Sequence, residues 1–131
     1  MKGTYVHLIG AVLALAVGGC ALTPESVEAP LDRRVTLAAD LARDVLVSNI
    51  RCVRGEGGYL HFQAEAVNRT TADCGVEWRI AWLDASGLEI ESVAATWRKL
   101  MIPPQDIVAL TSTAPNPAAV DFRFYVRKLR R

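Results

Sequence analysis

The chain has 131 residues, of which 51% are hydrophobic, and its 15 basic residues nearly balance its 14 acidic ones. This near-neutral charge excludes the strongly basic surface that nucleic-acid-binding proteins use, and nucleic acid is not an expected partner. The length allows one ordinary domain with a single hydrophobic core.

The N-terminus has the parts of a secretory signal: Lys2 near the start, an apolar run from Leu8 to Val17, and small residues before a cleavage site. The run is too short to span a bilayer, which takes about 20 apolar residues. Val17-Gly18-Gly19-Cys20 resembles a bacterial lipobox, which implies cleavage before Cys20 and lipidation of its thiol. The alternatives are an ordinary signal in which a cysteine happens to follow the small residues, and a core helix, which the lack of a polar face disfavours. We expect a lipoprotein that is held at a membrane by acyl chains, palmitate among them, on Cys20.

This interpretation divides the chain into a cleaved signal peptide (1–19), a lipidated cysteine with a flexible tether (20–34) and a folded domain (35–131). The tether contains prolines and charges without an apolar period. Ala21 follows the cysteine, whereas aspartate at this place retains enteric lipoproteins in the inner membrane. If the source is Gram-negative, we therefore expect an outer-membrane anchor with the domain facing the periplasm.

Leu37, Leu41 and Val45 open the domain at four-residue spacing, which fits one or two helical turns or the start of the first strand. The sequence does not decide between the two. Further along, apolar residues alternate with polar ones, which is typical of strands with one buried face. Three stretches alternate in this way: 59–68, 76–82 and 120–126.

Turn-forming residues separate these strands from four others. The additional candidates are a first strand before the glycine-rich turn at 55–58 and strands at 88–93, 96–102 and 107–112. Seven short strands with almost no helix predict an all-β, antiparallel sandwich of immunoglobulin-like or fibronectin-like shape.

The apolar positions of the alternating strands form the predicted core. For Trp78 and Trp82 the alternative interpretation is an exposed aromatic shelf that binds a glycan or peptide. The predicted core residues are Phe62, Val76, Trp78, Ile80, Trp82, Phe122 and Phe124. Possible surface contacts are Trp97 and the basic tail of Arg127, Lys128, Arg130 and Arg131. For Trp97 a place in the core is the competing interpretation, and for the tail a solvated chain end.

The sequence offers few residues for catalysis or metal binding. His61 is the only histidine after the signal peptide, and it lies on the polar face of its strand. Together with Cys52 and Cys74 it could form a soft-metal site, but the chain has no C-x-x-C pair and no obvious fourth ligand. We therefore predict no metal, no cofactor and no enzymatic activity.

The two cysteines are predicted to be free although exported proteins meet an oxidising compartment. Cys52 falls near the end of the first strand, opposite Leu60 or His61, and Cys74 starts the third strand. They thus sit near opposite ends of the second strand, about 23 Å apart, whereas a disulfide tolerates at most about 7 Å between Cα atoms. Both thiols are expected to be buried and reduced.

The stretch from Glu77 to Ile90, with Trp97, Ile102-Pro103-Pro104 and the closing 122–126 segment, resembles the YcfL family of lipoproteins, DUF1425. The resemblance implies a β-sandwich lipoprotein of the Gram-negative envelope without an established biochemical activity. It hints, by association only, at peptidoglycan-synthesis machinery as a partner. We expect a binding or scaffolding module for another envelope protein or the cell wall. The alternatives are a small periplasmic hydrolase or metal-dependent enzyme, and a purely structural lipoprotein.

Overall fold

Seven strands and two short 3-10 helices make up the described part of the chain, residues 33–130, in this computed structural model. The elements are β1 (Val35–Leu37), β2 (Val45–Arg54), η1 (Glu56–Gly58), β3 (Leu60–Asn68), β4 (Cys74–Leu83), η2 (Val93–Ala95), β5 (Arg98–Ile102), β6 (Ile107–Thr113) and β7 (Asp121–Lys128). The predicted signal peptide, Cys20, most of the predicted tether and Arg131 lie outside the described residues. Neither helix within residues 33–130 has the length and apolarity needed to cross a membrane.

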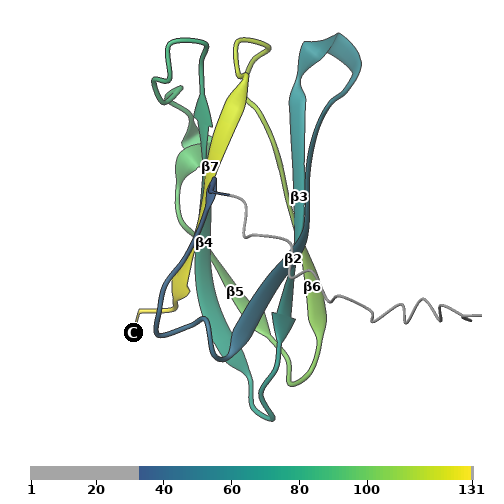
Figure 1. The fold of residues 1–131 in the computed structure, drawn as a ribbon, viewed down its shortest axis with the longest axis vertical. Helices are drawn as coiled ribbons and strands as arrows, with labels where there is room; N and C mark the ends of the chain where they lie inside the picture. The colour runs from purple at the N-terminus through teal and green to yellow at the C-terminus, as the bar shows by residue number, and fades with distance from the viewer. Residues whose placement is uncertain (1–32, 131) are drawn as a thin grey trace, which may run out of the picture.

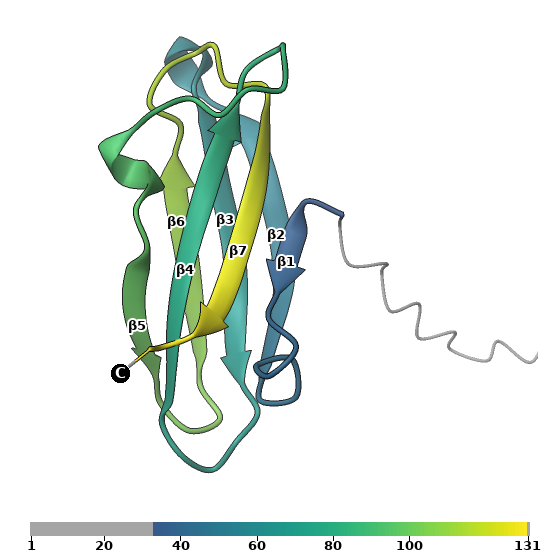
Figure 2. The same ribbon diagram turned by 90° about the vertical axis from the view of Figure 1, so that its left-hand side faces the viewer.

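The strands form two sheets that pack face to face as a β-sandwich (Figure 1). One sheet has the strand order β1-β7-β4-β5 and is called sheet A here; the other has the order β2-β3-β6 and is called sheet B. All neighbouring strands are antiparallel except β1, which pairs in parallel with the middle of β7, residues 124–126 (Figure 2). The predicted sandwich of seven strands is confirmed, but one of its pairings is parallel.

The alternating residues of β3, β4 and β7 fill the space between the sheets. The seven residues expected in the core are all buried, Trp82 and Phe124 completely. The Phe62 ring joins the two sheets, because its centroid lies 5.0 Å from that of Phe122 and 4.8 Å from that of Phe124. Burial of such large rings is the main source of stability in a small sandwich.

The predicted strand at 88–93 is wrong. Only one isolated bridge, between Leu83 and Glu89, forms in this region. The Asp84 carboxylate accepts hydrogen bonds from the backbone N–H groups of Ser86 and Leu88 at 2.8 and 3.0 Å, which fixes a turn. Leu88 and Val93 are 67% and 94% exposed, and Ile90 alone among the apolar residues of the segment packs against the core, which is too little to hold a strand in register.

The segment from Thr36 to Val45 contains both the helical turns and the strand that its apolar spacing allowed. After β1, the N–H groups of Ala42 and Val45 donate to the carbonyls of Ala38 and Leu41, which makes two helical turns before β2 begins. Leu41 is fully buried beneath them. The connection from sheet A to sheet B therefore packs against the core.

Candidate functional site

The outer face of sheet A carries a buried ion pair. Glu77 on β4 lies directly opposite Arg127 on β7 and, on its other side, opposite Lys99 on β5. The Arg127 Nε–H donates to the Glu77 carboxylate at 2.8 Å. The Glu77 side chain is only 6% exposed although it points away from the core, and that of Arg127 is 29% exposed.

Trp97 covers this ion pair. The Arg127 Cζ atom lies 3.7 Å from the centroid of the Trp97 ring, so the guanidinium packs closely on the indole. Glu77, Trp97 and Arg127 are called the outer-face cluster below. The structure thus places Trp97 outside the core, half-buried, and brings it together with the first residue of the predicted basic tail.

A shallow depression of about 310 Å³ adjoins the cluster where β7 ends. It is lined by Ala38, Asp40, Arg127, Lys128, Leu129 and Arg130. Leu129 packs over Gly75, where an added Cβ atom would come within 3.0 Å of the leucine side chain. This contact and a hydrogen bond from the Leu129 N–H to the Gly75 carbonyl fix the tail at the start of β4.

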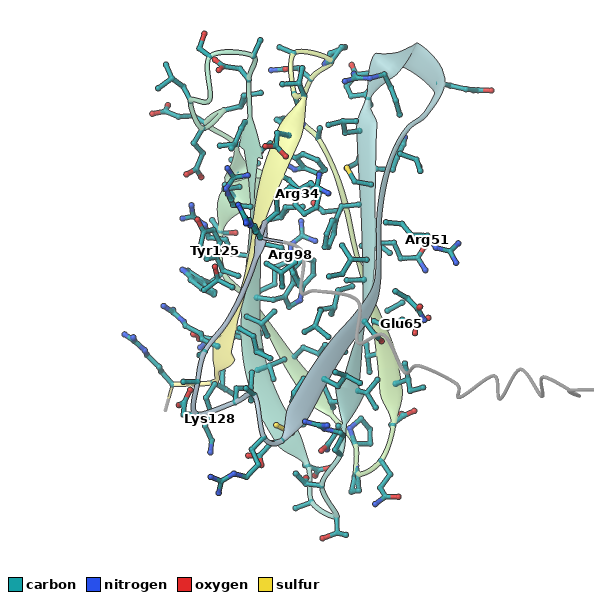
Figure 3. All side chains as sticks on the ribbon, viewed as in Figure 1. Arg34, Arg51, Glu65, Arg98, Tyr125 and Lys128 are labelled. Atoms are coloured by element: carbon teal, nitrogen blue, oxygen red, sulfur yellow. The ribbon has the colours of Figure 1, made fainter. Side chains whose placement is uncertain are left out.

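Two other arginines serve the fold. The Arg98 guanidinium lies over the Trp78 ring, with its Cζ atom 4.8 Å from the centroid, and donates to the Thr111 carbonyl at 3.2 Å, so it links β5 to β6. The Arg34 Cζ atom lies 4.6 Å from the centroid of the Phe122 ring. In Figure 3 both arginines lie between the two sheets, whereas Tyr125 points outward from sheet A and Arg51 from sheet B.

Asp121 anchors the start of β7. Its carboxylate accepts a hydrogen bond from the backbone N–H of Phe122 and forms ion pairs with Arg123 at 3.1 Å and Arg34 at 3.6 Å. Partial burial raises the pKa of this carboxyl group, but the hydrogen bonds and the two guanidinium groups outweigh it and hold the pKa below its ordinary value.

The thiols lie in different sheets and are free, as predicted. Cys52 pairs with Phe62, one residue beyond the predicted position, and Cys74 pairs with Ile102. Cys74 is buried, but Cys52 is only half-buried, which corrects the expectation for that thiol. Burial raises the pKa of both thiols, so neither is activated as a nucleophile.

The remaining polar candidates have local partners. His61 is exposed and its Nδ1 atom lies 3.0 Å from the Thr113 hydroxyl. Asn68 begins an Asn-Arg-Thr sequence that matches a glycosylation acceptor, but its side chain is fully buried and donates to the carbonyls of Ile102 and Pro103. Within residues 33–130 no three His, Cys, Asp or Glu side chains gather as metal ligands.

The structure joins four of the residues that the sequence singled out and adds others. Arg127, Lys128 and Arg130 line one depression, and Trp97 stacks on Arg127. Sequence reasoning missed Glu77 because its role depends on the register between β4 and β7. It also missed Asp40, and no signal in the sequence could have placed that turn beside the tail.

Comparison with known proteins gives a family and a fold. The family model described as "Protein of unknown function (DUF1425)" matches residues 32–128. The crystal structure of a DUF1425 family member from Shewanella sp. pv-4 is similar with 24% identity and a TM-score of 0.59 over 66% of this chain and 80% of that one. The crystal structure of cj0090 from Campylobacter jejuni is similar with 27% identity and a TM-score of 0.63 over 73% and 98%. No curated protein matches the sequence.

Proposed function

We propose that this chain, which belongs to the DUF1425 family of proteins of unknown function, is a lipid-anchored envelope protein without enzymatic activity that binds another envelope protein through the outer face of sheet A. The outer-face cluster is the observation that carries the proposal. It is a buried ion pair under a tryptophan, on a side of the sheet that does not face the core.

The composition of this face favours a protein partner. Trp97, Tyr125, Arg79 and Arg127 lie on it, and Trp, Tyr and Arg are the residues that dominate binding energy at protein interfaces. The Arg79 Cζ atom lies 5.6 Å from the centroid of the Tyr125 ring, so a second arginine also packs on an aromatic ring. Side chains held in this way lose little conformational entropy when a partner binds.

The outer face of sheet B differs. It carries exposed apolar side chains at Leu46, Val53 and Ile107 beside polar ones such as Gln63 and Thr111, but none of its strands contains a tryptophan or tyrosine. Sheet A is therefore the more suitable contact surface.

The anchor is tested by replacement of Cys20. Cys20→Ser should abolish incorporation of radioactive palmitate and release the protein from the membrane fraction. Continued labelling of the variant would contradict lipidation at this residue.

The binding face is tested by photo-crosslinking in intact cells, with a photoreactive amino acid at position 99 on sheet A and, as matched control, at position 63 on sheet B. Both positions are exposed on strands and point away from the core. A discrete adduct from position 99 alone, lost with Trp97→Ala, supports the proposal. If muramidase digestion removes the adduct, the partner is the cell wall and not a protein. Equal adducts from both positions, or none, would contradict a specific face.

A further inference from the structure

Arg127 is held in one position with hydrogen-bonding capacity to spare. Its Nε–H is used by Glu77, and its plane packs on Trp97. Its two Nη groups make no hydrogen bond to any residue of the described range 33–130. A guanidinium fixed through Nε presents its remaining N–H groups in a rigid arrangement, which suits an oxyanion.

Two more cations share the depression with Arg127. Within residues 33–130 the side chains of Lys128 and Arg130 form no ion pair, and the only acidic residue in the lining is Asp40. Because Arg127 is already paired with Glu77, the three cations face two carboxylates, and an excess of one positive charge remains. The phosphodiester of a phospholipid headgroup carries one negative charge, which matches this excess, and two non-bridging oxygens that can accept hydrogen bonds from the Arg127 Nη groups.

We propose that this depression binds phosphate, and that its ligand is the headgroup phosphate of an anionic phospholipid in the membrane that holds the protein. The inference rests on the proposed lipid anchor, because an anchored domain is always close to headgroups. The apolar part of the lining, Ala38 and Leu129, can contact the glycerol of such a lipid while the cations contact its phosphate.

The test follows backbone amide resonances of residues 127–130 by NMR, with the full chain in neutral detergent micelles. Phosphatidylglycerol, phosphatidylcholine and inorganic phosphate are titrated separately. We expect saturable shifts with phosphatidylglycerol that weaken as salt rises, and much smaller ones with the other two.

The Lys128→Gln/Arg130→Gln double variant keeps the outer-face cluster and should fold. Each basic residue near an anionic lipid surface contributes about fivefold in affinity, so the pair should weaken binding about 25-fold. Arg123→Gln is the matched control, because Arg123 lies on the same strand but is paired with Asp121. It should bind like the unmodified protein.

Unchanged binding in the double variant, or no shift with phosphatidylglycerol, would overturn the proposal. Equal shifts with inorganic phosphate would make free phosphate the ligand and overturn the lipid assignment. None of these outcomes depends on acylation of Cys20 or on the adduct at position 99, so this inference and the proposed function fail separately.

Discussion

Removal of Arg127 should destabilise the domain far more than a surface arginine would. Arg127→Gln leaves the Glu77 carboxylate, 6% exposed, without its cation. Breaking a buried ion pair from one side costs about 3–5 kcal/mol, whereas an exposed pair is worth about 0–1 kcal/mol. Because the Arg127 side chain is itself 29% exposed, we expect a loss of about 2–3 kcal/mol. That is a large share of the roughly 5–15 kcal/mol that holds a small domain.

Urea unfolding followed by tryptophan fluorescence measures this loss, with Arg79→Gln as the control. Arg79 lies on the same face and pairs with Glu89 at 2.8 Å, but the Glu89 side chain is 41% exposed. Its replacement should therefore cost less than about 1 kcal/mol. The double-mutant cycle of Arg127→Gln with Glu77→Gln should give a coupling above about 1 kcal/mol. Equal losses for the two arginines, or a coupling near zero, would refute the buried-pair reasoning.

Three further predictions concern the core, the thiols and pH. Trp82→Ala should cost about 3–5 kcal/mol in the same urea assay, because the side chain is fully buried; a loss near 1 kcal/mol would contradict its place in the core. Thiol counting on denatured, unreduced protein should find Cys52 and Cys74 free, and a monomer without free thiols at these positions would mean a different strand order. The lowered pKa of Asp121 stabilises the fold above its ordinary value of 3.8, and this contribution is lost as pH falls through the lowered pKa. The stability difference between the unmodified protein and Asp121→Asn should thus shrink on acidification below pH 3.8; a constant difference would exclude this linkage.

The sandwich could be predicted because its strands bury one face each. Alternation in β3, β4 and β7 set both the strands and their inward residues, and the burial of Phe62 and Phe124 matches it. The predicted separation of Cys52 and Cys74 needed only strand order and length. Its error of one residue in the partner of Cys52 reflects the register of the β2–β3 hairpin, which also contains an irregularity between Ser48 and Arg51.

Other features depend on contacts between distant segments. β1 has only three residues, and it forms a strand because it pairs in parallel with the otherwise unpaired edge of β7. The 88–93 segment alternates weakly, but hydrogen bonds to Asp84 determine its course. The outer-face cluster combines residues from β4, β7 and the segment before β5, and only the register places Glu77 beside Arg127. A sequence pattern shows which residues face outward, and not which of them meet.

Both ends of the domain form the proposed phosphate site, and this geometry bears on how an anchor would act. Ala38 and Asp40 follow β1, which continues directly from the predicted tether, while the cations follow from β7. Twelve residues separate Cys20 from Arg33, and such a segment reaches at most about 43 Å. A tether of this length alone would not orient the domain. It would, however, hold the phosphate site near the lipid headgroups at a millimolar effective concentration, at which a weak phosphate contact is enough to orient the domain. In a protein anchored through Cys20 as proposed, loss of Lys128 and Arg130 should therefore change the orientation of the domain without releasing it from the membrane.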